Sequence, residues 1–140
     1  MIRVLVVEDS PTARALLVLL LDKDPEIRVV GQASNGRQAV QMAKELAPDL
    51  ITMDVVMPDM NGVEATREIM SQNPIPILFV TAHSDTPELN LAFDALKAGA
   101  LDLINKPHGF EEENEDEWGR ELLSKIKALA RIRLKPMEDS

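Results

Sequence analysis

The chain has 140 residues, which is long enough to bury one hydrophobic core, so a single domain is expected. Hydrophobic residues make up 45% and charged residues 28%, a composition that excludes a disordered chain. The net charge of -9 disfavours direct binding to nucleic acid or to an anionic membrane surface. The absence of cysteine excludes disulfides and thiolate metal sites and agrees with a soluble, cytoplasmic protein, as does the lack of a long apolar run.

Five short apolar runs are predicted to be strands. They are Ile2–Val7, Val29–Ala33, Leu50–Met53, Ile75–Thr81 and Ala100–Asn105. Longer amphipathic segments alternate with them, which is the pattern of βαβ units that build a parallel sheet. The sequence therefore predicts an α/β protein with an aliphatic core, because aromatic residues are only 3% of the chain.

Five helices are predicted, with starts marked by capping residues and ends marked by glycine or proline. The first helix begins at Ser10–Pro11 and the third at Asn61. The second covers Gly36–Leu46, the fourth runs from Thr86 to Gly99, and the fifth covers Glu115–Leu134. The acidic segment His108–Asp116 is expected to be a loop or a ragged helix start. The domain is expected to span residues 1–134, and residues 135–140 to form a linker or a frayed tail.

Polar residues stand at the carboxyl ends of four predicted strands. Glu8 and Asp9 follow the first strand, Asp54 follows the third, Thr81 ends the fourth and Lys106 follows the fifth. In an open parallel sheet these ends lie at one edge, where ligands bind. We therefore expect three carboxylates, a hydroxyl and an ammonium to converge there.

Three neighbouring carboxylates repel one another unless a cation joins them. Mg²⁺ prefers oxygen ligands, so Glu8, Asp9 and Asp54 are predicted to hold it. Asp54 is then predicted to be a nucleophile for a phosphoryl group, with Thr81 donating a hydrogen bond and Lys106 neutralising a phosphoryl oxygen. Taken singly, these residues also fit a helix cap, a turn hydroxyl and a surface charge; the combination favours the phosphoryl site.

Several motifs occur in a characteristic order. They are Glu8-Asp9-Ser10, Asp54 followed by Met57-Pro58-Asp59-Met60-Asn61-Gly62, Thr81-Ala82, and Gly99-Ala100 leading to Lys106-Pro107. Together they resemble the response-regulator receiver family over about residues 2–132. The resemblance implies a doubly wound, flavodoxin-like sheet of five parallel strands in the order 2-1-3-4-5, with five helices.

The resemblance also implies the chemistry of each matching position. Asp54 would accept a phosphoryl group from a histidine kinase or a small phosphodonor. Glu8, Asp9, Asp54 and the main-chain carbonyl of Val56 would bind Mg²⁺, while Lys106 would contact the phosphoryl group. Such a domain catalyses its own phosphorylation and dephosphorylation, and is a signalling module rather than an output enzyme.

Other positions would switch the domain or tune the phosphate lifetime. In the family, the residue matching Thr81 moves toward the phosphoryl group, and an aromatic three residues before the lysine turns inward. This chain has Leu103 at that place, which departs from the pattern. The switch and tuning positions implied are Thr81, Ala82, His83, Leu103 and Pro107, the last after a cis peptide bond. In relatives, the positions of Val56 and His83 border the phosphoryl water.

A closer resemblance is to the receiver half of the chemotaxis protein-glutamate methylesterase. It rests on Asp24-Pro25, Val29-Val30-Gly31, Asp54 to Gly62, Gly99 to Asp102, and Asn105-Lys106-Pro107. The partners implied are a sensor histidine kinase and an output domain or partner protein bound at the fourth helix, fifth strand and fifth helix, which carries Trp118. No direct nucleic-acid or membrane contact is expected, and a phosphorylation-dependent dimer is left open.

Other functions remain as alternatives. A stand-alone response regulator that acts by protein–protein contact has the same site. A Mg²⁺-dependent phosphatase of haloacid-dehalogenase type needs a second aspartate two residues after the first, where this chain has Val56. A flavodoxin-like cofactor binder needs a phosphate loop that is absent after the first strand, and a degenerate receiver would lack the site residues. Trp118 is expected to be a core residue, or to cover an interface, and His83 to be an exposed loop residue.

Overall fold

The structure is a computed structural model that describes residues 1–55, 57, 60–81, 97–105 and 112–132. Its centre is a five-stranded parallel sheet in the order β2-β1-β3-β4-β5, as predicted. The strands are β1 (Ile2–Val7), β2 (Ile27–Ala33), β3 (Leu50–Asp54), β4 (Ile77–Thr81) and β5 (Asp102–Asn105). The first strand matches its predicted bounds, and the others differ by one or two residues at an end.

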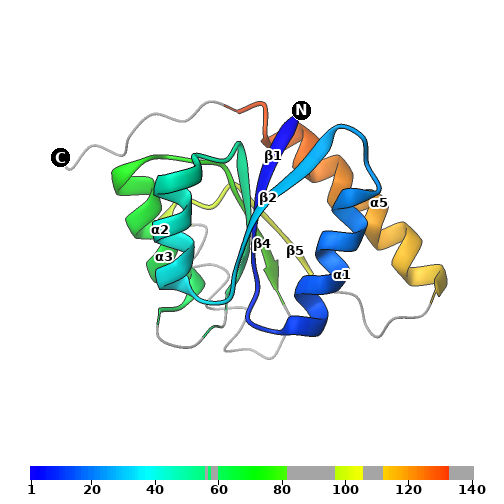
Figure 1. The fold of residues 1–140 in the computed structure, drawn as a ribbon, viewed down its shortest axis with the longest axis horizontal. Coiled ribbons are helices and arrows are strands. Elements are labelled where there is room, and N and C mark those ends of the chain that lie inside the picture. The colour runs from blue at the N-terminus through cyan, green and yellow to red at the C-terminus, as the bar shows by residue number, and fades with distance from the viewer. Residues whose placement is uncertain (56, 58–59, 82–96, 106–111, 133–140) are drawn as a thin grey trace.

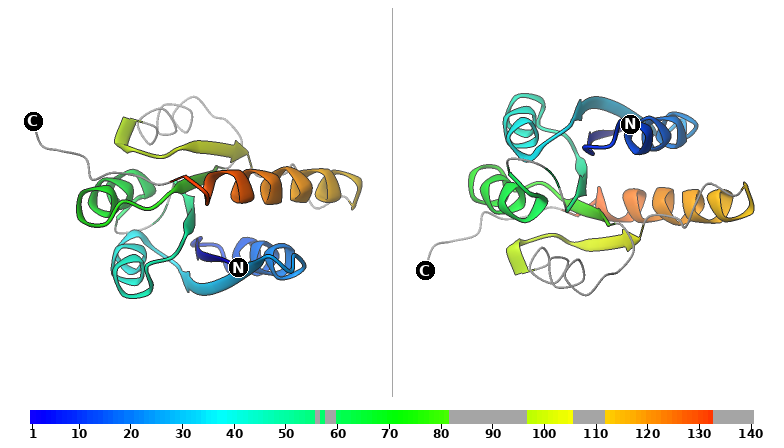
Figure 2. Two further views of the ribbon diagram at one scale, coloured as in Figure 1. Left: turned by 90° about the horizontal axis from the view of Figure 1, so that it is seen from above. Right: turned by 90° about the horizontal axis from the view of Figure 1, so that it is seen from below.

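Helices cover both faces of the sheet. The described helices are α1 (Pro11–Asp22), α2 (Gly36–Leu46), α3 (Gly62–Gln72) and α5 (Glu112–Leu129). Figure 1 shows α2 and α3 on one face of the sheet and α1 and α5 on the other, and the views along the strands in Figure 2 show the same three layers. The predicted fourth helix, which begins at Thr86, falls mainly outside the described residues.

Side-chain caps start the first three helices, and two of them, Ser10 and Asn61, stand where the sequence predicts a helix start. Ser10 Oγ accepts a hydrogen bond from the Ala13 backbone N–H at 3.3 Å. Asn61 Oδ1 accepts one from the Glu64 N–H at 2.9 Å, and Asn35 caps α2 in the same way. Each cap satisfies a backbone donor that the helix itself leaves unpaired. These caps set where the chain turns from each strand into its helix.

The last helix differs from the prediction at both ends. It begins at Glu112, inside the acidic segment predicted to be a loop or a ragged helix start, and it ends at Leu129 rather than at Leu134. The charged run is therefore a helix start.

The sheet separates two hydrophobic cores. Alternating residues of β1 show the division, because Leu5 and Val7 face α2 and α3 while Val4 and Val6 face α1 and α5. Both cores are mainly aliphatic, as predicted, with Phe79 in the first and Trp118 in the second. Within the described ranges, no helix has the length and apolarity needed to cross a bilayer.

Candidate phosphoryl-transfer and metal site

Strand register brings the predicted site positions to one edge of the sheet. Asp54 pairs with Val80 at the end of β3, and Thr81 pairs with Asn105 at the end of β4. Lys106 follows Asn105 directly in the sequence. Four strand ends thus reach the same edge, the lower one in Figure 1. This is the edge where ligands bind in doubly wound sheets.

Three carboxylates meet at this edge. Glu8, Asp9 and Asp54 each offer an oxygen, and these oxygens all lie within 4.8 Å of one another. Glu8 is fully buried and Asp54 is 6% exposed, whereas Asp9 is exposed. The three side chains therefore converge as predicted.

The donor set suits a hard divalent cation. Two of the three carboxylates are shielded from bulk water, so water screens their mutual repulsion poorly. Carboxylate oxygens are the ligands that Mg²⁺ prefers, and it keeps its remaining positions for water or phosphate oxygens. The exposure of Asp9 leaves one side of the cluster open to solvent. The residues present thus fit Mg²⁺ bound at an accessible edge.

Several predicted site features lie outside the described residues. They are the Val56 carbonyl, the Thr81 side chain, Ala82, His83, Lys106, and Pro107 with the cis peptide bond expected before it. Leu103 is described: it is half-buried in β5, beside Phe79 of β4, and packs against the core under α3. An aliphatic side chain therefore occupies the place where the family pattern has an aromatic.

The turn after Asp54 is tightly packed. The Gly62 backbone N–H donates to the Val55 carbonyl at 2.9 Å, which closes the loop between β3 and α3. A Cβ atom on Gly62 would lie 2.3 Å from the Asp54 carbonyl oxygen, so only glycine fits this approach. Gly62, in the motif predicted to position the peptide after Asp54, is therefore required sterically, because a larger residue would clash with the backbone there.

Sequence reasoning missed the contact of Arg14 with the acidic edge. Arg14 lies one turn inside α1, and its Nη1 donates to the Glu8 carbonyl oxygen at 2.8 Å. The sequence did contain a signal for this contact. Arg14 stands four residues after the Ser10 cap, on the helix that directly follows the two acids. Arg14 therefore joins the helix to the end of β1.

Trp118 is buried, as predicted, and also has a polar contact. Its side chain is 8% exposed within the core between the sheet and α1 and α5. Its indole Nε1–H donates to the Asn105 carbonyl oxygen at the end of β5. Helix α5 is thereby attached to the residue that precedes Lys106.

Comparison with known proteins identifies the family that has this fold. The chain belongs to the response regulator receiver domain family, whose model matches residues 4–114. It is 48% identical over 134 residues to protein-glutamate methylesterase/protein-glutamine glutaminase 3 of Anaeromyxobacter dehalogenans. That match covers 96% of this chain and 39% of the relative, so the chain spans about two fifths of the relative's length.

Solved structures agree in fold. The response regulator domain of Thermotoga maritima CheB is 40% identical, with a TM-score of 0.84 and coverage of 96% of this chain and 99% of that one. The receiver domain of the Pseudomonas aeruginosa sensor histidine kinase PA1611 is 28% identical, with a TM-score of 0.75 and coverage of 92% and 97%. That receiver holds a magnesium ion in its active-site cleft.

Proposed function

We propose that Asp54 accepts a phosphoryl group in a Mg²⁺-dependent reaction and that this modification switches the domain. The observation that carries the proposal is the meeting of Glu8, Asp9 and Asp54 within 4.8 Å at the carboxyl edge of the sheet. Asp54 is the member placed at the end of the central strand β3, with the other two beside it after β1. It therefore has both a metal-binding neighbourhood and a backbone held by Gly62.

In the proposed reaction, a carboxylate oxygen of Asp54 attacks the phosphorus of a phosphohistidine or an acyl phosphate. The Asp54 O–P bond forms, the donor P–N or P–O bond breaks, and the bond's electron pair leaves with the imidazole or carboxylate. Bound Mg²⁺ would neutralise phosphoryl charge. Glu8 and Asp9 would hold it, with the Val56 carbonyl. Thr81 and Lys106 would contact the remaining phosphoryl oxygens.

The test is phosphorylation by acetyl phosphate, followed by intact-protein mass spectrometry. The wild type is expected to gain the mass of one phosphoryl group with Mg²⁺ and to gain none in EDTA. Asp54→Asn should gain none in either buffer, because an amide is a poor nucleophile. Asp22→Asn is the matched control, since Asp22 is exposed at the end of α1, away from the acidic cluster, and it should label normally.

Labelling of Asp54→Asn at the wild-type rate would overturn the assignment of the acceptor. Equal labelling of the wild type with Mg²⁺ and in EDTA would overturn the metal requirement. Replacing Thr81 with Ala is expected to preserve labelling and weaken the conformational response. Loss of labelling in that variant would contradict a role confined to the switch.

The partners we propose are a sensor histidine kinase as donor and a protein-glutamate methylesterase domain, in chemotaxis-type signalling, as output. Support comes from relatives that carry that name and are longer than this chain. Calorimetric titration of the chain into the methylesterase domain of the Anaeromyxobacter relative should give an affinity that changes when beryllofluoride and Mg²⁺ are added. No binding in either state would favour the alternative, a stand-alone regulator with another protein partner.

A further inference from the structure

The bond between Arg14 and the Glu8 carbonyl closes the turn that carries two of the three acids. Arg14 is six residues after Glu8, and its side chain runs back along the first turn of α1 to reach that carbonyl at 2.8 Å. The same turn is held from the backbone side, because the Arg14 N–H donates to the Ser10 carbonyl at 2.9 Å. Both ends of the segment from Glu8 to Ser10 are therefore tied to one residue.

The bonded carbonyl belongs to the peptide that joins the two acids. Its orientation determines the direction in which the chain leaves Glu8 and thus where Asp9 begins. Glu8 is fully buried in the protein, whereas Asp9 is exposed, so packing restrains its side chain less. The backbone therefore determines the position of the Asp9 carboxylate more strongly than it determines the position of the Glu8 carboxylate.

We propose that Arg14 is a positioning residue for the Mg²⁺ site, which orients the Glu8–Asp9 peptide so that both carboxylates face the ion together with Asp54. This inference rests on the proposed function, since it concerns the metal of that same site. Arg14 touches no reacting atom; it acts through the main chain. Groups that orient metal ligands from outside the coordination sphere commonly change metal affinity by about tenfold or more.

Charge and geometry predict opposite results when Arg14 is replaced. A guanidinium beside a cation site repels the cation, so removing its charge alone would tighten Mg²⁺ binding. Removing the bond to the Glu8 carbonyl would weaken it, because the two acids lose their preset arrangement. The sign of the change in affinity therefore separates the positioning role from a general electrostatic role.

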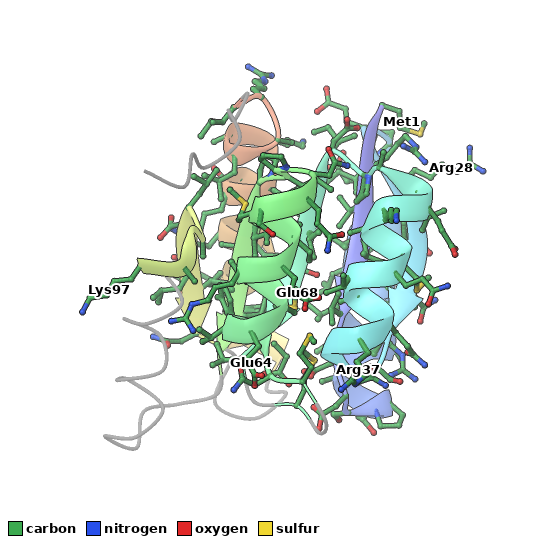
Figure 3. The ribbon with its side chains drawn as sticks, turned by 90° about the vertical axis from the view of Figure 1, so that its left-hand side faces the viewer. Met1, Arg28, Arg37, Glu64, Glu68 and Lys97 are labelled. Carbon is green, nitrogen blue, oxygen red and sulfur yellow. The ribbon has the colours of Figure 1, made fainter. Side chains whose placement is uncertain are left out.

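The experiment is calorimetric titration of MgCl₂ into the wild type, Arg14→Gln, Arg14→Lys and Arg37→Gln. Arg37 is the matched control, because it is an exposed arginine in the first turn of α2. Figure 3 places it at the end of the molecule opposite Met1, the end where the strands finish. Arg14→Gln should raise the Mg²⁺ Kd about tenfold. Arg14→Lys keeps the charge on a shorter stem and should also raise it, whereas Arg37→Gln should leave it unchanged or slightly lower.

Thermal unfolding in EDTA provides the folding control. Glutamine and arginine have similar helix propensities, so Arg14→Gln should retain a cooperative transition close to that of the wild type. An unchanged or tighter Kd in Arg14→Gln would overturn the positioning role and leave the proposed function standing. A wild type that binds no Mg²⁺ would overturn both, and a wild-type Kd in Arg14→Lys would overturn the requirement for the guanidinium bond to the Glu8 carbonyl.

Discussion

The two ends of the strands use charged residues in opposite ways. At the amino ends, Lys127 Nζ lies 2.7 Å from Asp24 Oδ2 and 3.1 Å from Glu26 Oε2, which ties α5 to the start of β2. Arg3 Nη1 donates to the Ala47 carbonyl at 3.0 Å. Opposite charges and carbonyl acceptors meet there, so these side chains join neighbouring elements of the fold.

At the carboxyl ends, like charges meet. Glu8, Asp9 and Asp54 lie together, and two of them are buried. Such an arrangement costs folding free energy unless a cation is bound. Proteins commonly tolerate this cost where function requires it. The ion pairs at the amino ends therefore contribute to stability, whereas the proposed binding site at the carboxyl ends costs stability.

The largest effect is expected from the backbone that supports the acidic edge. Gly62→Ala would place a Cβ atom 2.3 Å from the Asp54 carbonyl oxygen. Because a backbone atom cannot move aside easily, the variant should lose about 2 to 3 kcal/mol in the free energy of unfolding, measured with urea. The result would show that the geometry of this end is imposed by close packing.

Gly119→Ala is the control for that substitution. Gly119 is buried within α5, and its added Cβ would lie 3.4 Å from Leu20 Cδ2, an ordinary contact. Alanine also favours helix over glycine, so this variant should gain roughly 0.5 kcal/mol. Equal and small effects of both substitutions would contradict the tight approach at Gly62.

Removing one carboxylate charge should change the free energy of unfolding by a smaller amount, and with opposite sign at the two ends of the strands. In EDTA, Asp54→Asn is expected to raise the free energy of unfolding by about 1 kcal/mol, because it removes one of three clustered charges. Asp24→Asn makes the same chemical change at the amino ends and should lower it, because Lys127 loses a partner. Urea unfolding of both variants checks this. A decrease for Asp54→Asn would contradict the idea that the acidic edge costs stability.

The smallest effect concerns pH at the amino ends. The hydrogen bond from Lys127 holds the pKa of the Asp24 carboxyl below its usual range, and the Glu26 backbone N–H adds to this. A lowered pKa contributes stability above the unfolded value, and that stability is lost as the pH falls through the folded value.

Lys127→Met should therefore melt roughly 2 °C below the wild type at pH 7, and the difference should begin to shrink as the pH falls below about 4 and vanish only below the lowered folded pKa of Asp24. Calorimetry at pH 7, 5 and 3 measures this. A difference as large at pH 3 as at pH 5 would mean that the packing of the Lys127 stem matters rather than the ion pair.

The predictable parts of the molecule are those governed by local rules. The caps at Ser10 and Asn61 and the β-branched run Ile2–Val7 set the element starts, and the strand order follows the family resemblance. The meeting of the three acids followed from the rule that parallel strand ends share an edge. The acidic start of α5 was predicted only as one of two alternatives, a loop or a ragged helix start, because charged residues are common in both.

The unpredicted parts depend on side-chain contacts between residues that are separated in the sequence. The bond from Arg14 to the Glu8 carbonyl requires a specific rotamer on a helix of known position. The ion pair between Lys125 and Asp102 joins residues 23 apart in the sequence, and hydropathy patterns carry no information on it. Partial burial would raise the pKa of Asp102, but hydrogen bonds from Lys125 and the Leu103 N–H outweigh it and lower that pKa.

The hydrogen bond of Trp118 has a practical consequence. This residue is the chain's single tryptophan, and its indole contacts the last residue of β5, next to Lys106. Indole emission depends on hydrogen bonding and on nearby charge, so all tryptophan fluorescence of the chain originates beside one strand end of the acidic edge. The protein therefore carries a built-in optical probe, with which events at this edge can be timed by stopped-flow mixing without any added label.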